Sequence, residues 1–404
     1  MKRTRDKTYH DKVHNFEHKR PKVVNYLDSF SSMYDRPFPN FREPVEIGSF
    51  SQDERKIYKN DKSQLRIFAP PVDPNHCKFD LRQGYAEMIK RDENIKTYIN
   101  DILHWIVNNR NKFPIPTHSK DKKVQQNLDD QCTADKSSLK RLNIDFICWR
   151  GLITRLLCIP YENREDLLVA VIRFRGTHYL CEYDTETKKA REENITPRDE
   201  EMCAWGFKFE QYVTADKVGA VPNTSVPVNN NAAFCSMAYS RLETHSLLFG
   251  GEVDCEDVNS QGRNKYIELK TSRLIENKRQ FENFCKYKLI KWWAQSFVIG
   301  IPRIVCGFRD DAGIVRKMKD YSLSEIPRIV NSTLHQPWKP TVCFNFLNAF
   351  LNFIKINITE DDESCVYLVR WKPGSPVTIE KKGDDSEFKF LPDWFIHWEA
   401  WSTP

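Results

Sequence analysis

The sequence lacks the cysteine spacing that marks a structural zinc site. Its 12 cysteines are scattered at positions such as Cys77, Cys148 and Cys235, and no two of them form a Cys-x-x-Cys pair. No secretory signal precedes them, and many lie within apolar runs. This pattern favours reduced, buried thiols in a protein of the nucleus or cytosol. We therefore expect neither a zinc cluster nor a disulfide framework.

Long apolar runs and a strong net charge of one sign are also missing. No apolar stretch is long enough to span a bilayer, so no membrane partner is expected. The net charge of +6 is too mild to predict a polyanionic partner by itself. An apolar content of 40% and a charged content of 29% are ordinary for a soluble globular protein, and 404 residues can bury a large core.

Strand-like and helix-like segments alternate irregularly along the chain, and no internal repeat is present. Residues 1–24 are basic and show no hydrophobic period, which predicts a disordered tail. Within this tail, Lys19-Arg20-Pro21-Lys22 is either a nuclear localisation signal or simply part of a solvated segment. Residues 25–404 are expected to form a single α+β or mixed α/β domain.

Individual elements are assigned from periodicity and turn signals. Loops are expected at Tyr34–Pro74 and His118–Arg141, and a helix or loop at Ala232–His245. Strand-like runs are Ile144–Arg150, Leu152–Ile159, Ser246–Asp254, Lys265–Thr271, Ile304–Phe308 and Ile314–Met318. Helical patterns are Asp92–Phe113, Phe281–Val298 and Cys343–Ile356, and Asp199–Thr214 is expected to be either a helix or a loop.

Two short apolar segments carry the most informative polar residues. They are Gly250-Gly251-Glu252-Val253-Asp254 and Ile267-Glu268-Leu269-Lys270. Residues two apart on a strand point to the same face, so Glu252 and Asp254 are expected to project together, as are Glu268 and Lys270. The polar segment between them predicts a β-hairpin.

Such a carboxylate cluster beside one ammonium group has the chemistry of a metal-dependent nuclease. Mg²⁺ prefers oxygen ligands, and phosphodiester hydrolysis needs a cation that neutralises phosphate and activates water. The alternative is a solvated hairpin edge. The apolar neighbours Leu247–Phe249 and Tyr266-Ile267 argue against it, because burying several carboxylates without counter-charge is costly.

Three other segments could contribute to the same site. Lys288, Lys291 and Gln295 can share one helix face and contact phosphates, although lysines on such a face are usually only solvated. Arg150 ends an apolar strand, where it could clamp a phosphate, and Glu210 could add another carboxylate. Alone, either of these two could equally be part of a structural ion pair.

Five segments in this order resemble the decapping and exoribonuclease protein (DXO) family. They are Trp149-Arg150-Gly151, Gly206–Tyr212, Gly251–Cys255, Ile267–Ser272 and Lys288–Phe297. The resemblance runs from about Phe38 to Trp398 and includes Phe79–Arg82, Asn231–Cys235 and Phe390–Trp394. It implies mixed β-sheets flanked by helices, with a core related to the PD-(D/E)XK nucleases.

The resemblance also implies an activity and a set of site residues. The activity is hydrolysis at RNA 5′ ends with two Mg²⁺ or Mn²⁺ ions, which removes unmethylated caps, NAD caps or 5′ triphosphate and can continue as 5′→3′ exoribonuclease action. Implied metal ligands are Glu210, Glu252, Asp254, Glu268 and the Leu269 carbonyl. Lys270 and Gln295 would contact the scissile phosphate or the attacking water. The substrate path would be lined by Trp149, Arg150, Gly151 and Cys235.

This sequence departs from the family pattern at two substrate contacts. Lys56 stands where some relatives have an arginine, and Thr97 stands where an acidic residue is found on the first helix. Both departures concern cap preference. Family members occur in the nucleus and cytoplasm, and some assist a nuclear 5′→3′ exoribonuclease, which is therefore a candidate partner. One alternative is a non-catalytic RNA-binding role, against which the complete acidic set argues. The other is a DNA nuclease with the same core, which is disfavoured because the matching segments extend well beyond that core.

Overall fold

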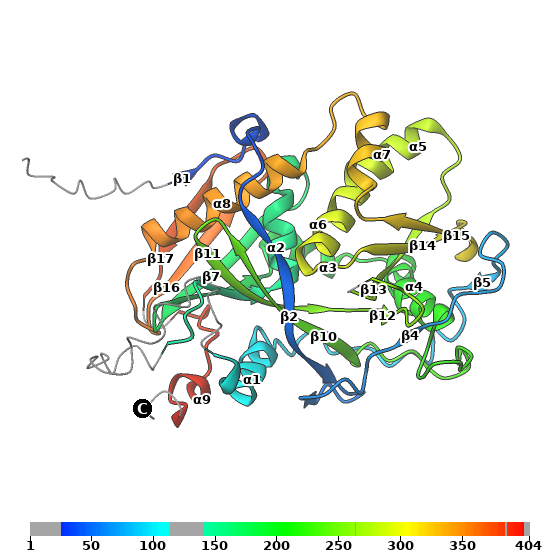
Figure 1. Ribbon diagram of the computed structural model, residues 1–404, viewed down its shortest axis with the longest axis horizontal. Coiled ribbons are helices and arrows are strands. Elements are labelled where there is room, and N and C mark those ends of the chain that lie inside the picture. Colours follow the sequence, from blue (N-terminus) through cyan, green and yellow to red (C-terminus); the bar gives the residue numbers. More distant parts are fainter. Residues whose placement is uncertain (1–25, 114–140, 263, 384–385, 400–404) are drawn as a thin grey trace, which may run out of the picture.

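Two β-sheets organise the computed structural model, which describes residues 26–113, 141–262, 264–383 and 386–399 (Figure 1). The predicted tail at residues 1–24 and nearly all of the loop predicted at His118–Arg141 lie outside these ranges. In the described residues the larger sheet has ten strands, in the order β1 (Tyr26–Leu27), β17 (Val377–Lys381), β16 (Val366–Trp371), β7 (Leu167–Phe174), β8 (Thr177–Tyr183), β6 (Phe146–Trp149), β11 (His245–Glu252), β10 (Ala233–Leu242), β2 (Phe41–Gln52) and β3 (Tyr58–Lys59).

The smaller sheet has seven described strands, in the order β5 (Phe79–Asp80), β15 (Ile314–Ser322), β14 (Arg303–Arg309), β13 (Tyr266–Arg273), β12 (Cys255–Glu256), β4 (Ile67–Phe68) and β9 (Thr214–Ala215). Both sheets mix parallel and antiparallel pairs, as predicted: β6 runs parallel to β11 and β8, and β13 runs parallel to β14. Strands β14 and β15 form the predicted pair, and Gly313 adopts a φ of 81° in the turn between them.

Helices cover both faces of each sheet. They are α1 (Asn100–Asn108), α2 (Arg150–Cys158), α3 (Glu186–Glu193), α4 (Pro197–Val213), α5 (Lys278–Asn283), α6 (Leu289–Ile299), α7 (Ile326–Thr333), α8 (Pro340–Asn357) and α9 (Asp393–Ile396). Short 3₁₀ turns occur at Ser31–Tyr34, Arg110–Lys112 and Ile159–Tyr161, and a π-helical turn at Phe284–Lys288 joins α5 to α6. None of the helices described is long and apolar enough to cross a bilayer.

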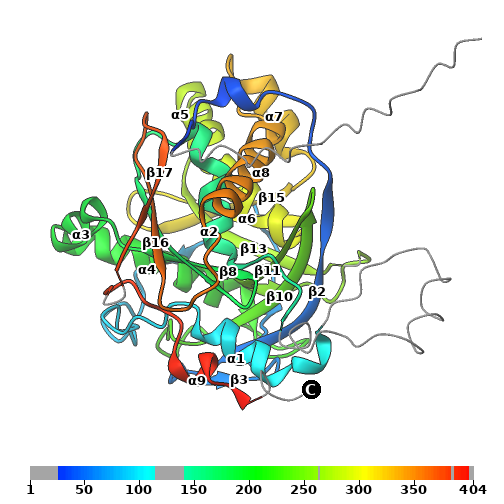
Figure 2. The same cartoon turned by 90° about the vertical axis from the view of Figure 1, so that its left-hand side faces the viewer.

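The main core lies where the two sheets face each other across helices. Helices α2, α6 and α8 pack on one face of the larger sheet, and α6 also packs against Ile304 and Cys306 of β14 (Figures 1 and 2). Helix α1 covers the opposite face of the larger sheet, and α4 covers the opposite face of the smaller one, where it meets Val305. Strand β14 is therefore buried on both faces, as its continuous apolar run suggests.

The chain passes from the larger sheet to the smaller one immediately after β11. The Val253 N–H donates to the Phe234 carbonyl at 2.9 Å, and Cys255 then pairs with Ile267 in the smaller sheet. The predicted hairpin between Ser246–Asp254 and Lys265–Thr271 is therefore wrong, because β11 and β13 belong to different sheets. The hairpin that forms is shorter and joins β12 to β13.

Three other predicted segments also adopt a different structure. The loop expected at Tyr34–Pro74 contains β2, which tolerates Pro44 because the register with β10 shifts at this point and no backbone donor is needed. Ala233–Leu242 is strand β10, buried along its length, so its apolar run shows no alternation. The run Leu152–Ile159 forms most of α2, where Leu152 and Leu156 are four residues apart on the buried face.

The position of α4 depends on a glycine in the smaller sheet. A Cβ built on Gly307 of β14 would lie 2.5 Å from the ring of Phe209, which is fully buried on α4. We expect Gly307→Ala to lower the free energy of unfolding by about 1–3 kcal/mol, because the ring must move, and to displace the adjacent Glu210.

Urea unfolding and RNA hydrolysis assays would measure both effects of Gly307→Ala. The control is Gly206→Ala on the same helix, where an added Cβ meets no atom within 4 Å. This control should stabilise the helix by about 0.5–1 kcal/mol. Equal stability of the two variants would contradict the role given to the Gly307–Phe209 contact.

Candidate active site

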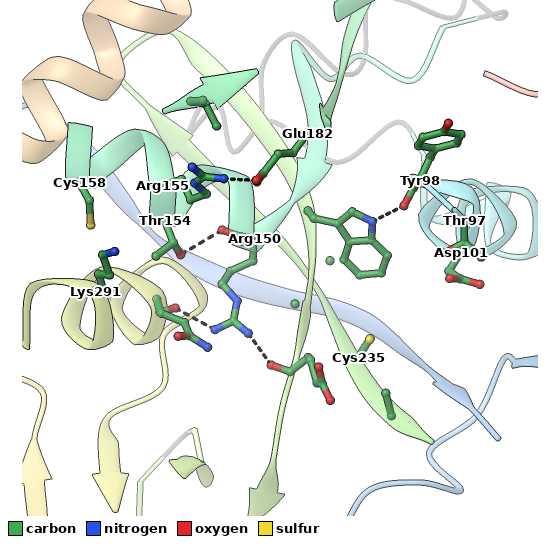
Figure 3. Close-up of a pocket in the computed structure, with 18 of the residues that line it drawn as sticks. Thr97, Tyr98, Asp101, Arg150, Thr154, Arg155, Cys158, Glu182, Cys235 and Lys291 are labelled. Carbon is green, nitrogen blue, oxygen red and sulfur yellow. Dashed lines mark hydrogen bonds and ion pairs between the residues drawn. The ribbon is translucent and has the colours of Figure 1, made fainter. Parts of the chain in front are cut away.

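A cavity of about 590 Å³ opens at the edge of the larger sheet where β11 ends (Figure 3). Its lining includes seven residues that the sequence predicted for the substrate path or the catalytic centre, namely Lys56, Trp149, Arg150, Gly151, Cys235, Glu252 and Gln295. Glu210, Asp254, Glu268, Leu269 and Lys270 are not part of this lining. They surround the inner end of the cavity, beyond Glu252 and Gln295.

The register of three neighbouring strands brings the lining residues together. Cys235 of β10 lies opposite Glu252 at the end of β11, and Gly250 of β11 lies opposite Trp149 at the end of β6. Helix α2 begins directly after Trp149, and no side chain caps its first turn. Its free N–H groups therefore lie at the cavity wall, where they suit a phosphate.

Glu268 is the centre of a buried polar network. Its side chain is 1% exposed, and its carboxylate accepts hydrogen bonds from Gln295 Nε2 at 2.5 Å, from Arg150 Nη1 at 3.4 Å and from Lys270 Nζ. Asp254 accepts a hydrogen bond from the Leu269 backbone N–H at 2.6 Å. The predicted association of Asp254, Glu268, Lys270 and Gln295 is therefore present in the structure.

The four carboxylates do not share this network equally. The pKa of Glu268 is held below its usual range because Lys270 and Arg150 outweigh the effect of burial. Burial raises the pKa of Asp254 to about 8, and the charge of Glu268 adds to the rise. Burial and the charges of Asp254 and Glu252 raise the pKa of Glu210 well above its usual value. The Glu252 side chain is exposed to the cavity, yet desolvation by the surrounding protein still raises its pKa.

This charge balance fits divalent cations. Among the described residues, the cations that act on the four carboxylates are Arg150 and Lys270, which act on Glu268, and Arg91, which acts on Glu252, so the cluster carries excess negative charge when fully ionised. Within the described ranges, no three His, Cys, Asp or Glu side chains lie close enough to hold an ion as they stand. The Glu268 carboxylate instead accepts hydrogen bonds from Arg150, Lys270 and Gln295.

Arg150 holds the two sheets and α6 together. It is 6% exposed, and it donates to the Glu252 carbonyl at 2.9 Å and to the Gln295 carbonyl at 3.4 Å, besides its bond to Glu268. The sequence left a phosphate clamp and a structural ion pair open at this position. In the structure, the ion pair with Glu268 is present, and both terminal nitrogens of the guanidinium bind protein groups.

We expect Arg150→Met to lower the free energy of unfolding by about 3 kcal/mol, because Glu268 loses one of its counter-charges in a buried site. Arg150→Lys should recover only part of this loss, since an ammonium group cannot reach the three acceptors in the same geometry. Thermal unfolding at fixed pH measures both variants. A loss below about 1 kcal/mol, the value for an exposed pair, would contradict the buried network.

The two lysines predicted to share a helix face with Gln295 lie in different surroundings in the structure. Lys291 lines the cavity and pairs with Glu162 at 2.9 Å. Lys288 lies outside the cavity and donates to Ser272 Oγ at 3.2 Å. Of the two lysines, only Lys291 lies where it can contact a substrate phosphate.

The outer end of the cavity contains residues that the sequence analysis missed. Asp101 is buried, accepts a hydrogen bond from Gln52 Nε2 at 2.8 Å and lines the cavity together with Arg91. Thr97, the position of the family's acidic contact, also lines the cavity but precedes α1, which begins at Asn100. Asp101, in the first turn of α1, therefore places a carboxylate in the cavity where Thr97 has none. An acidic residue beside Ile102 on an otherwise apolar helix face was the signal in the sequence.

Lys56 reaches this outer end from a strained turn. Its φ of 63° is unusual for a residue with a side chain, and Asp53 stabilises the turn by accepting the N–H groups of Arg55 and Ile57. Backbone strain of this kind is often found at functional sites. Burial and the charge of Arg91 lower the pKa of Lys56.

Comparison with known proteins agrees with this geometry. Residues 42–396 match the family described as RAI1 like PD-(D/E)XK nuclease. The chain is 37% identical to the decapping and exoribonuclease protein of Xenopus laevis, over 92% of this chain and 90% of that protein. It is also 37% identical to the human protein of the same name, over 94% of this chain and 91% of that protein. The predicted resemblance is therefore confirmed.

Solved structures show the same fold. Scheffersomyces stipitis Rai1 in complex with (3′-NADP)⁺ and calcium aligns with a TM-score of 0.74 at 24% identity, covering 93% of this chain and 97% of that one. Candida albicans Rai1 in complex with pU5 and Mn²⁺ aligns with a TM-score of 0.73 at 22% identity, with the same coverage. The predicted fold class, mixed sheets flanked by helices with a PD-(D/E)XK-like core, is confirmed.

Proposed function

Because this chain belongs to the RAI1 like PD-(D/E)XK nuclease family, we propose that its buried carboxylate cluster is the hydrolytic centre. The chain is a hydrolase that acts on RNA 5′ ends. The observation that supports this assignment of the centre is the excess of acidic groups at the inner end of a cavity whose walls carry cations and free N–H groups. That arrangement suits a phosphate chain held by divalent ions.

We propose that two Mg²⁺ or Mn²⁺ ions bind to Glu210, Glu252, Asp254 and Glu268 and to the Leu269 carbonyl. Bound ions would supply charge neutralisation of the phosphate and a more acidic water. The raised pKa of Glu210 and of Asp254 supports this assignment, since burial and the neighbouring carboxylates outweigh the charge of Lys270 at both groups. The related Rai1 structures were obtained with Ca²⁺ and Mn²⁺.

Other residues of the chain would position the substrate. Lys270 and Gln295 both donate to Glu268, so an ion that took up this carboxylate would leave their N–H groups available for a phosphate oxygen. The N-terminus of α2 can hold a neighbouring phosphate. Trp149 is fixed by a hydrogen bond of 2.7 Å from its Nε1 to the Tyr98 carbonyl (Figure 3) and offers a flat wall to a base.

The preferred 5′ ends are proposed to be unmethylated caps, NAD caps and 5′ triphosphate, followed by 5′→3′ removal of nucleotides. Each of these ends carries an extended phosphate chain. A cavity with Lys56 and Arg91 at one end and Gln295 at the other offers polar contacts along such a chain. Asp101, at the same end as Lys56 and Arg91, can accept hydrogen bonds from a base or sugar.

The test uses RNAs that differ only in the 5′ end: triphosphate, unmethylated cap, methylated cap, NAD cap and monophosphate. Each is incubated with the purified protein and Mg²⁺, or with chelator. We expect the first two and the NAD cap to be hydrolysed faster than the methylated cap, and chelator to stop every reaction. Activity that survives chelator would contradict the metal proposal. Inertness on all five RNAs would favour a non-catalytic RNA-binding role.

We also propose that the protein acts in the nucleus, with a second pool in the cytoplasm, and that a nuclear 5′→3′ exoribonuclease is a partner. The basic run Lys19-Arg20-Pro21-Lys22 supports nuclear import. Fusion of residues 1–24 to a fluorescent reporter tests the signal, and a variant with the four residues changed to Ala is the control. Co-purification with the exoribonuclease tests the partner.

A further inference from the structure

We propose that a groove leading away from the cavity past Lys291 binds the body of the RNA chain as a single strand. This groove is formed by Tyr161, Arg164, Lys286 and Tyr287 together with the segment His335–Lys339. This proposal rests on the RNA 5′-end activity of the chain. The groove is a further binding surface, outside the carboxylate cluster and its cavity.

The groove adjoins the cavity, with which it shares wall residues. A hollow of about 100 Å³ shares Cys158, Glu162, Glu165 and Lys291 with the cavity wall. The same hollow shares Tyr161 and Lys286 with a surface depression of about 600 Å³ that extends to His335 and Lys339. An RNA whose 5′ end occupies the cavity therefore has neighbouring hollows along one route across the protein surface.

The side chains along this path suit single-stranded RNA. The guanidinium carbon of Arg164 lies 4.8 Å from the ring centroid of Tyr287, and Lys286 Nζ lies 5.2 Å from the same centroid. Such a stack of a flat cation on an aromatic ring can receive a base, and the charges can contact phosphates. Stacking of this kind tolerates any base, as required of an enzyme that reads the 5′ end rather than the sequence.

The charges of Arg164 and Lys286 are available for a ligand. In the part of the chain that the structure describes, neither residue forms an ion pair, and both are exposed. The acidic residues along the groove have other partners: Glu162 pairs with Lys291, Glu165 with Arg191, Asp35 with Lys339 and Glu282 with Lys278. Arg164 and Lys286 therefore offer two positive charges, next to Tyr287, that these carboxylates do not take up.

The backbone at this position is also unusual. Lys286 and Tyr287 lie in the π-helical turn Phe284–Lys288, between α5 and α6. A π-turn is rare and often marks a functional site, because the extra residue changes the phase of the helix. Here Tyr287 and Lys291 are four residues apart and line the same hollow, whereas Lys288 turns toward Ser272. One helix thus joins the groove to Gln295.

The experiment compares RNAs of two lengths that carry the same 5′ triphosphate, a dinucleotide and a chain of about 20 nucleotides. Variants are Lys286→Glu, Arg164→Glu and Tyr287→Ala. We expect kcat/KM on the long RNA to fall by about tenfold for Tyr287→Ala, from the loss of one stacked base. The loss on the dinucleotide should be several-fold smaller. Each charge variant should also reduce the salt dependence of long-RNA binding by about 0.7 in the log–log slope, as for one phosphate contact.

The matched control is Lys317→Glu. This lysine is exposed and lies 5.8 Å from the ring centroid of Phe308, but it belongs to β15, away from the groove. It should keep the wild-type ratio between long and short RNA. Equal losses on both lengths for the groove variants would overturn the proposal, as would the absence of any loss. Failure of the wild-type protein to hydrolyse the dinucleotide and the long RNA alike would instead count against the 5′-end activity itself.

Discussion

Asp254→Asn is expected to lower the rate of RNA 5′-end hydrolysis by about 10³-fold while the protein stays folded. The amide oxygen of Asn can still accept the Leu269 N–H that Asp254 accepts at 2.6 Å, so the local backbone should not move. What the substitution removes is one negative charge from the group proposed to hold the divalent ions. Single-turnover assays with excess enzyme would measure the loss at the chemical step.

Glu256→Gln is the matched control for this experiment. Glu256 is the next acidic residue in the chain after Asp254, but it lies in β12, paired with Tyr266 and outside the carboxylate cluster. It should keep nearly full activity. If Asp254→Asn and Glu256→Gln were equally active, the cluster could not be the hydrolytic centre.

In the absence of divalent ions, the free energy of unfolding is expected to fall as the pH rises from about 5 to 8. In the folded chain without ions, the pKa of Asp254 is raised to about 8 and that of Glu210 is raised well above its ordinary value. At any pH between about 4, the ordinary carboxyl pKa, and these raised values, the folded state therefore binds more protons than the unfolded chain does. Stability from this source is complete below about pH 4 and is lost as the pH rises through the folded pKa, a change on the order of a few kcal/mol.

Divalent ions should reverse this trend, because they bind the deprotonated carboxylates. The rise in melting temperature caused by Mg²⁺ or Mn²⁺ should be larger at pH 8 than at pH 6, where protons compete with the ions. Thermal unfolding with chelator and with each ion measures this difference. In Asp254→Asn, the loss of stability with pH should be smaller and the response to ions weaker. A larger ion effect at pH 6 would contradict the assignment of these carboxylates as ligands.

The two experiments are linked by one physical cause. Asp254→Asn removes repulsion between buried carboxylates, so the ion-free variant should be more stable than the ion-free wild type although it is inactive. A cluster arranged to hold cations is unfavourable without them, which is a common conflict between activity and stability.

The polar residues of the site could be predicted from the sequence because their spacing needs only local geometry. Glu268 and Lys270 are two apart on β13, and the structure places their side chains in contact. The pairing of the strands could not be predicted in the same way. Gly250 and Gly251 are packed against different side chains on the two faces of β11, including Trp149 on one and Ile299 on the other. Such a strand must be internal to a sheet, and a two-stranded hairpin does not supply those neighbours.

Residues distant in the sequence were predicted less well. Asp101 lines the cavity only because β2 brings Gln52 beside α1, and no spacing within the helix encodes that contact. For Arg150 the sequence left a phosphate clamp and a structural ion pair open, and only the structure shows its protein partners, among them Glu268. A pattern in the chain specifies what a side chain can bind, whereas packing decides what it does bind.

The position of Arg150 also has a consequence for how the molecule unfolds. This one guanidinium joins the end of β11 in the larger sheet, Glu268 in the smaller sheet and the α6 backbone. Neither sheet can separate from the other without leaving a charge without a partner in an apolar core. The two sheets should therefore be lost together in a single cooperative transition, rather than as independent units.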